Sequence, residues 1–521
     1  MGKEGIAMDL SFFRKRPIKL VSASLLVIII ILLAFNAFNI GPFDEQAVIQ
    51  AYRPNKVLEE AGANLSTYDM QIEFNPDTNK IKCVQNFEYI NNTTETHDRL
   101  YFHIYPNAFK YETKVPFPQE EMIQAYPNGF SPGGIELISV SSDGSELAYS
   151  IGGYSEEILE VHSIDPIVPG GTMEITMDFE VTLPNSLGRF GYGNYTFNIT
   201  NWYPILCVYD QEGWNTYPYF PIGDPFYSDV ANYNVKISAP EDYTIACTGD
   251  ILSIDQEGNN KIWEIEATAV RDFAFVASDR FMLASKKVGG TTVYSYYITP
   301  KGGKKALKYA TDAIKIFNKL FGKYPYNQFS VVEADFYIGG MEYPNLVLID
   351  QSLYLPEAYS LLEIVVVHET AHQWWYGVVG NNQIEDAWLD EGLTEYSTLL
   401  YFKHRYGQKT MDNVKASVIA EGKYGLLSVY TEGEDIDETI AKPLYSFSDW
   451  IIYDLLVYGK GAMMFYALKE EVGEKDFYKI LEEYYRENSF KNISITELLY
   501  ACEEVTGKDY TDFFNEWLYD E

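Results

Sequence analysis

The sequence is poor in cysteine. Cys83, Cys207, Cys247 and Cys502 are the only 4 among 521 residues, and no two form a C-x-x-C pair. As a set they are therefore poor zinc ligands. An even number of cysteines in an exported chain permits disulfides, but buried free thiols fit equally well, so we predict no pairing.

Positive charge is also scarce. Lysine and arginine total 39 against 75 aspartate and glutamate residues, and the formal net charge is −36. Nucleic-acid binding needs a basic surface, so we predict no nucleic-acid partner. A strong acidic excess instead suits a soluble surface at a salty or crowded cell exterior.

The composition is otherwise that of a globular protein, with 47% hydrophobic and 22% charged residues and no repeats. The length allows about three domains. Aromatic residues make up 16% of the chain, including 44 tyrosines, which favours a large share of β-strands.

One long apolar run stands near the N-terminus, between residues 20 and 40. As a helix, its 21 residues would be about 31 Å long, enough to cross a membrane. Four basic residues between positions 14 and 19 precede it and acidic residues follow it. We therefore predict a cytoplasmic tail (1–19), a single-pass anchor (20–40) and an extracellular remainder. A cleaved signal peptide is the alternative.

Residues 41–63 are predicted to form a polar stalk, and residues 64–284 a β domain. Met173 to Leu183 has an apolar residue at every odd position, the pattern of a strand with one buried face. Turn residues separate several similar runs, which predicts an antiparallel sandwich or saddle-like sheet. These further runs are Tyr68–Phe74, Lys82–Ile90, Leu100–Tyr105, Tyr233–Ile237 and Ile262–Ala267.

The pattern changes to helical spacing near Pro300, and we predict a mainly helical domain over residues 285–521. Two strand-like runs, Phe329–Glu333 and Leu346–Asp350, interrupt it. The predicted helices are Lys304–Phe321, Glu357–Val379, Ile384–Tyr406, Leu455–Val472, Asp476–Glu487, Ser494–Thr506 and Tyr510–Tyr519.

The helix predicted from Glu357 carries the sequence His368-Glu-Thr-Ala-His372. Histidines four residues apart lie on one helix face and can hold a zinc ion together, while Glu369 reaches a bound water. A third ligand is needed, and Glu391 in the next predicted helix can supply it. The alternative is a helix with two hydrogen-bonded core histidines. Only 6 histidines occur in the chain, which makes a chance match uncommon.

Eighteen residues, from Gln373 to Asp390, separate the second histidine from Glu391. This spacing resembles the ligand set of gluzincin peptidases, and of the aminopeptidase N-like family in particular, which also includes the leukotriene hydrolases. Two further motifs are similar to those of the family: Gly339-Gly-Met-Glu-Tyr-Pro344 and Tyr458-Gly-Lys-Gly461. The resemblance implies a multidomain α+β protein with an N-terminal β-sandwich or saddle and a thermolysin-like, mainly helical catalytic domain.

The resemblance also implies a role for each site residue. His368, His372 and Glu391 would bind one Zn²⁺ per chain. Glu369 would act as the general base and Tyr458 would stabilise the oxyanion. Glu342 would bind the free α-ammonium of a substrate, next to a strand that pairs with the substrate backbone. That strand consists of Gly339, Gly340 and Met341.

The sequence departs from the family at three points. Tyr343 and Asp390 stand where the family has asparagines, and the β-domain group that assists amine binding is not evident. Asn198 and Asn201 are candidates for that group. The chain ends at Glu521 without the C-terminal helical-repeat domain of larger relatives, from which we expect a more open cleft.

Together these observations predict a membrane-anchored zinc aminopeptidase that faces the cell exterior and cleaves peptides with a free N-terminus. A thermolysin-like endopeptidase is one alternative. A catalytically silent binding or receptor protein on a peptidase scaffold is another, although such a scaffold has no need of Glu369.

Overall fold

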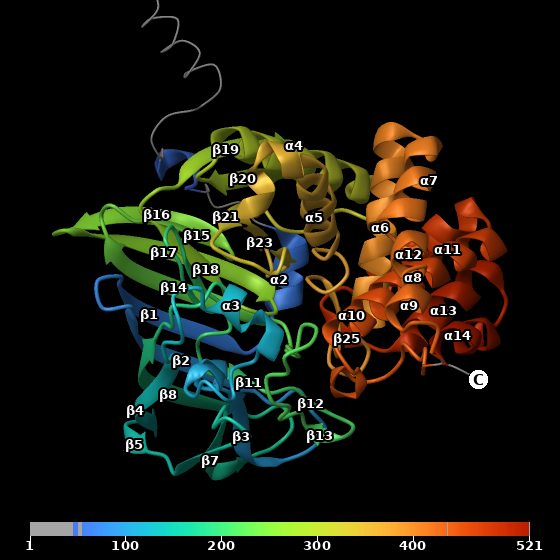
Figure 1. The fold of residues 1–521 in the computed structure, drawn as a ribbon. Helices are drawn as coiled ribbons and strands as arrows, with labels where there is room; N and C mark the ends of the chain where they lie inside the picture. Colours follow the sequence, from blue (N-terminus) through green and yellow to red (C-terminus); the bar gives the residue numbers. More distant parts are fainter. Residues whose placement is uncertain (1–44, 50–54, 435, 520–521) are drawn as a thin grey trace, which may run out of the picture.

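A computed structural model describes residues 45–49, 55–434 and 436–519. The predicted cytoplasmic tail and membrane anchor lie outside the described residues. The protein is a two-domain α+β structure, with β-sheets in its N-terminal part and helices in its C-terminal part (Figure 1).

The largest sheet has eight strands in the order β16-β17-β14-β1-β2-β8-β4-β5. Neighbours are antiparallel except β1 and β14, which are parallel. Burial alternates along β1, β2 and β8, as the apolar alternation predicts for a sheet with one buried face. The strands are β1 (Thr67–Asn75), β2 (Lys80–Ile90), β4 (Gly134–Ser142), β5 (Ser145–Glu146), β8 (Thr172–Thr182), β14 (Ala231–Pro240), β16 (Asp250–Glu257) and β17 (Asn260–Val270).

Smaller sheets cover the buried face of this large sheet. Ring contacts such as Phe87 with Phe102 and Phe74 with Phe275 join the layers, so the core between them contains aromatic as well as aliphatic side chains. One small sheet comprises β15 (Thr244–Cys247), β18 (Phe275–Ser278), β10 (Phe197–Ile199) and β9 (Gly191–Tyr192). Another comprises β11 (Ile205–Leu206), β3 (His97–His103), β7 (Ile158–Ile167) and β6 (Tyr149–Gly152); a third is the pair β12 (Tyr209–Asp210) and β13 (Gly213–Trp214).

A five-stranded sheet begins the C-terminal part, in the order β19-β20-β21-β23-β22. Its edge strand β22 is antiparallel to β23 and contains the Gly-Met of the predicted substrate-binding motif. The predicted domain boundary at 284/285 falls within β19. The strands are β19 (Met282–Val288), β20 (Thr291–Tyr297), β21 (Gln328–Ala334), β22 (Gly340–Met341) and β23 (Leu346–Asp350).

The helices pack beside and beyond this sheet (Figure 1). The long ones are α4 (Pro300–Leu320), α5 (Tyr359–Ala371), α6 (Trp388–Tyr406), α7 (Gln408–Ser417), α11 (Gly461–Val472), α12 (Glu474–Asn488), α13 (Ile495–Thr506) and α14 (Thr511–Leu518). The shorter elements are α2 (Lys56–Gly62), α3 (Met122–Ala125), α8 (Glu421–Tyr424), α9 (Leu427–Tyr430), α10 (Trp450–Tyr453) and the π-helix η8 (Asp454–Lys460), with the strands β24 (Val379–Asn381) and β25 (Lys491–Ile493).

Four predicted helices differ from those observed by four residues or more at one end. The helix predicted from Lys304 begins at Pro300. The helix predicted over Glu357–Val379 ends at Ala371, and turns follow it. Tyr376 then takes a φ of 115° before the chain enters β24. The helix predicted from Ile384 begins at Trp388. The first six residues of the predicted Leu455–Val472 helix belong to η8, so its α-helical part starts at Gly461.

Within the described residues, one helical stretch, Trp450–Val472, is long and apolar enough to cross a membrane. Inside the protein 67% of its apolar window is buried, as in the core helix of a globular domain.

Arg271 joins the two parts of the molecule. Its guanidinium is buried and donates to the carbonyl oxygens of Tyr376, Ser228 and Lys491 at 2.7, 2.9 and 2.7 Å. Tyr376 follows the histidine motif, so this arginine ties the β-rich part to the segment that carries the site.

Candidate metal centre and active site

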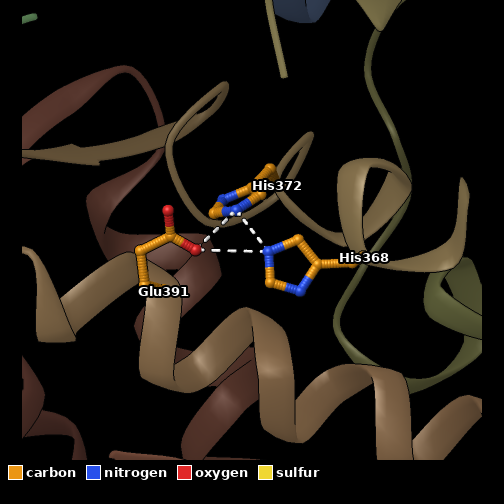
Figure 2. A group of neighbouring side chains, drawn as sticks. All are labelled: His368, His372 and Glu391. Atoms are coloured by element: carbon orange, nitrogen blue, oxygen red, sulfur yellow. Dashed lines mark hydrogen bonds and ion pairs between the residues drawn. The ribbon is translucent and has the colours of Figure 1, made fainter. Parts of the chain in front are cut away.

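The two histidines of the motif lie at the C-terminal end of α5, and Glu391 lies in the first turn of α6. Their side chains point toward one another (Figure 2). His368 Nε2 lies 3.0 Å from His372 Nε2 and 3.2 Å from Glu391 Oε2, and the third separation is 3.1 Å. All three donors can therefore reach one zinc ion at its usual bond lengths of about 2.0–2.2 Å.

The surroundings of the three donors fit a zinc site. His368 Nδ1 lies 3.0 Å from Glu395 Oε2, and His372 Nδ1 lies 3.0 Å from the carbonyl oxygen of Trp375. These acceptors hold the proton on Nδ1 of each ring, which leaves the Nε2 lone pairs facing inward as metal ligands. Burial opposes ionisation of Glu391, but the two histidines outweigh it and hold its pKa well below the ordinary value.

Glu369 lies on α5 beside the metal site and is buried. Burial raises its pKa to about 8, and a cation bound at the neighbouring ligands would favour the ionised form. Gly340 lies directly against this carboxylate. A Cβ at Gly340 would come within 2.1 Å of Glu369 Oε1, so only glycine fits there.

Tyr458 completes the other side of the site. Its hydroxyl donates to Glu391 Oε1 at 2.6 Å, and its ring stacks on that of His368 with 5.7 Å between centroids. Burial raises the pKa of Tyr458 well above the ordinary value, so the hydroxyl keeps its proton and can act as a donor. It belongs to η8, and π-helical turns are frequent at functional sites.

The predicted substrate-binding residues lie at the edge strand. Gly339 has a φ of 105°, a conformation that favours glycine, and Gly340 and Met341 form β22. Glu342 follows and is buried, with Oε1 3.2 Å from the Gln383 Nε2 that donates to it. The structure thus brings this segment beside the zinc ligands.

Several carboxylates crowd around Glu342. Its oxygen atoms lie within 4.8 Å of those of Asp224 and Glu391, and also close to His372 and Asp390. The nearby cation is Arg189, which is paired with Asp224. This end of the site therefore carries more negative than positive charge, and it favours a cationic group.

A cavity of about 260 Å³ connects these groups. Zinc ligands, Glu369, Tyr458 and Glu342 all form part of its wall. Its other lining residues include apolar side chains of α5, which are Leu361, Ile364 and Val365.

Sequence reasoning missed five charged residues of this cavity: Arg189, Asp224, Glu395, Lys423 and Asp454. Glu395 stands four residues after Glu391, one helical turn away, and that spacing was a usable signal. No local pattern marks the other four.

The two asparagines considered for amine binding do not line the cavity. Asn198 Nδ2 donates to the Asp335 carbonyl oxygen at 2.8 Å, and Asn201 Nδ2 donates to Asp272 Oδ2 at 2.8 Å. Both side chains are therefore engaged in hydrogen bonds inside the protein, away from the cavity. Asp224 is the carboxylate that reaches the cavity from the β-rich part.

Tyr343 and Asp390, which stand where the family has asparagines, both form side-chain hydrogen bonds. The Tyr343 hydroxyl donates to Thr200 Oγ1 at 2.6 Å, away from the zinc ligands. Asp390 Oδ2 accepts from Gln383 Nε2 at 2.7 Å, and burial raises the pKa of Asp390 to about 7.

Comparison with known proteins gives a family. Residues 305–517 match the model of the peptidase family M1 domain, and this segment contains all three zinc-site donors. This matched segment, residues 305–517, belongs to the M1 peptidase family. It is a zinc metallopeptidase scaffold, with the His-His-Glu cluster as its metal site.

Relatives within the M1 family are distant in sequence. Aminopeptidase N of Lactococcus lactis subsp. lactis is 23% identical over 67% of this chain and 42% of that protein. Endoplasmic reticulum aminopeptidase 2 of Homo sapiens is 25% identical over 62% of this chain and 35% of that protein. The chain thus spans less than half the length of these M1 relatives.

The fold is that of a two-domain M1 structure. The M1 zinc metallopeptidase from Deinococcus radiodurans superposes with a TM-score of 0.60 and 16% identity, covering 88% of this chain and 94% of that one. A variant of that Deinococcus enzyme is also known bound to a Tyr-Ser-Ala substrate, with the same coverage.

Proposed function

We propose that this protein is a zinc aminopeptidase that removes single residues from the N-termini of peptides. The observation that carries the proposal is the position of Glu342, a buried carboxylate beside the zinc ligands and among other acids. A substrate's α-ammonium compensates this excess of negative charge. An endopeptidase has no such group to bind, and burying these carboxylates without a cation is costly.

The residues around the metal supply the chemistry. His368, His372 and Glu391 would hold Zn²⁺, which when bound lowers the pKa of a water molecule toward about 7. Glu369 accepts a proton from the attacking water and passes it to the leaving amine. Tyr458 offers its hydroxyl to the carbonyl oxygen on which negative charge develops.

The substrate is held at both ends of the reacting residue. Its α-ammonium lies between Glu342 and Asp224, and its backbone pairs with the outer edge of β22, the last strand of its sheet. Asp224 thereby takes the place of the β-domain group that assists amine binding. The named relatives that are aminopeptidases support this assignment.

The test uses amino-acid 4-nitroanilides and the same compounds with an acetylated amine. We expect turnover of the free-amine compounds and at least about 100-fold less of the acetylated ones, since acetylation removes the charge that Glu342 binds. Glu369→Gln should retain zinc and lose turnover. Equal cleavage of both series would instead identify an endopeptidase. No cleavage of any peptide by the zinc-loaded wild type would identify a silent scaffold.

We also propose that the enzyme is anchored in the cell membrane with its catalytic part outside. The support comes from sequence alone: an uncharged run at 20–40 with basic residues before it. We expect the full chain in the membrane fraction and a chain starting at residue 41 in the soluble fraction. Protease added to intact cells should digest the anchored enzyme. A mature N-terminus beyond residue 40 would show a cleaved signal peptide instead.

A further inference from the structure

Lys423 lies on α8, in the cavity wall. Its Nζ is 2.6 Å from Asp454 Oδ1 and 3.3 Å from Glu395 Oε1. The same ammonium lies 4.6 Å from the centroid of the Tyr458 ring. It is therefore held by two carboxylates and an aromatic face at once, which leaves it no role as a binding group for a substrate carboxylate.

Two of these three contacts lead directly to zinc ligands. Glu395 accepts from Nδ1 of His368, and Tyr458 donates to Glu391. Lys423 thus contacts Glu395, the hydrogen-bond partner of the ligand His368. It also contacts Tyr458, the predicted oxyanion donor, which is hydrogen-bonded to Glu391. A carboxylate such as Glu395, which is 3% exposed, is costly to bury without a cation.

The backbone places Lys423 tightly. At Gly459, the residue after Tyr458, a Cβ would come within 2.8 Å of the Tyr424 nitrogen and 3.1 Å of Lys423 Cβ. Helix α8 therefore packs directly on η8, and the glycine makes this approach sterically feasible. Ala420, just before α8, is buried with a φ of 46°, a strained value for a non-glycine residue.

We propose that Lys423 is a positioning residue of the proposed peptidase reaction: it fixes Glu395 and Tyr458 relative to each other, and through them His368 and the oxyanion donor. The expected effect on kcat rests on the proposed function. The expected effect on zinc affinity rests on the metal site alone. Lys423 acts through its neighbours and touches no reacting atom.

The first experiment compares Lys423→Met, Lys423→Arg and wild type. We expect Lys423→Met to lower kcat by about 10- to 100-fold with KM changed less than about threefold, and to weaken zinc binding about 10-fold in competition with a chelator. Lys423→Arg keeps the cation and should recover most of both losses.

A matched control is Lys442→Met. Lys442 is also largely buried, with Nζ 2.8 Å from Asp437 Oδ2 and 4.9 Å from the Phe447 ring centroid. Its ion pair and ring contact within the described part of the chain involve no zinc-site residue. We expect its kcat and zinc affinity to equal those of wild type. Should Lys423→Met not fold, Asp454→Asn removes one of the lysine's anchors and should shift both quantities in the same direction, by a smaller factor.

A double-mutant cycle separates positioning from general destabilisation. In a Tyr458→Phe background, Lys423→Met should cost less in kcat than in wild type, because the hydroxyl it positions is gone. An equal loss of kcat in the wild-type and Tyr458→Phe backgrounds would overturn the proposal. So would zinc affinity and kcat that stay unchanged in both Lys423→Met and Asp454→Asn. If wild type cleaves nothing, the proposed function fails, and zinc affinity still decides the inference.

Discussion

Gly340 is the residue with the least room in the site. Any side chain there meets the carboxylate of Glu369, with the added Cβ 2.1 Å from Oε1. We predict that Gly340→Ala lowers kcat by about 100-fold or more, because Glu369, the proposed general base, must move away from the water it would deprotonate. Zinc content measured alongside kcat should stay at one ion per chain.

Gly152 provides the control for that substitution. An added Cβ at Gly152 meets no heavy atom within 4 Å, so Gly152→Ala should leave kcat unchanged. A fully active Gly340→Ala enzyme would show that Glu369 is free to move without loss, contrary to its assigned role.

Glu342 gives the second prediction at this scale. Glu342→Gln keeps the shape of the side chain and removes its charge, so we expect kcat/KM for free-amine substrates to fall by about 30- to 1,000-fold. Any slow cleavage of N-acetylated substrates should not change, and this difference distinguishes amine binding from general damage. An equal loss on both substrate series would contradict the assignment.

The residues of the metal site were predictable from sequence because their spacing is local. His368 and His372 share one helix turn, and Glu391 stands at a fixed offset from them. Asp224 and Lys423 were not predictable, because they reach the cavity from elements far away in the chain. For the same reason the sequence did not show that Asn198 and Asn201 hydrogen-bond to Asp335 and Asp272, which are distant in the chain.

At the scale of elements, the crossing of α6 and α11 explains two motif glycines. Gly392 follows the third zinc ligand and Gly461 ends the Tyr458 motif, and a Cβ on Gly392 would lie 3.1 Å from Gly461 Cα. We predict that Gly392→Ala lowers the free energy of unfolding by about 1–3 kcal/mol through overpacking. Urea unfolding monitored by tryptophan fluorescence measures this, and unchanged stability would show that the helices separate without cost.

Helix and strand periodicity predicted most long elements, such as β8 and α4, because each has one buried face. It did not predict η8, since a π-helix differs from an α-helix in its hydrogen bonds and not in its composition. Helices α7 to α9 were also missed. These helices form because they pack against neighbouring elements, as α8 does against η8. Gly459 allows that close contact, and no local sequence pattern indicates it.

At the scale of the whole molecule, buried carboxyl groups make stability depend on pH, and Asp272 is one measurable case. Burial raises its pKa to about 6, against an ordinary value of 3.8. Between pH 4 and 6 the unfolded chain has released this proton and the folded protein keeps it. Stability therefore falls as pH rises through that range, by about 3 kcal/mol from this group.

Asp272→Asn removes that titration. The unfolding free energy of wild type should fall relative to that of Asp272→Asn as the pH rises from 4 to 7. The fall should be complete once the pH is above the folded-state pKa of about 6. Denaturant unfolding at a series of pH values measures it. A constant difference would show that the buried carboxyl ionises in the folded protein as readily as in the unfolded chain.

The shortness of β22 has a consequence for how the proposed enzyme handles long substrates. Two strand residues span about 7 Å, so backbone pairing holds only the first residues of an extended peptide. Each cleavage also removes the ammonium that anchors the substrate, and the new one must be bound afresh. We therefore expect distributive rather than processive trimming: peptides shortened by one, two and three residues should accumulate in free solution, in that order, in a mass-spectrometric time course.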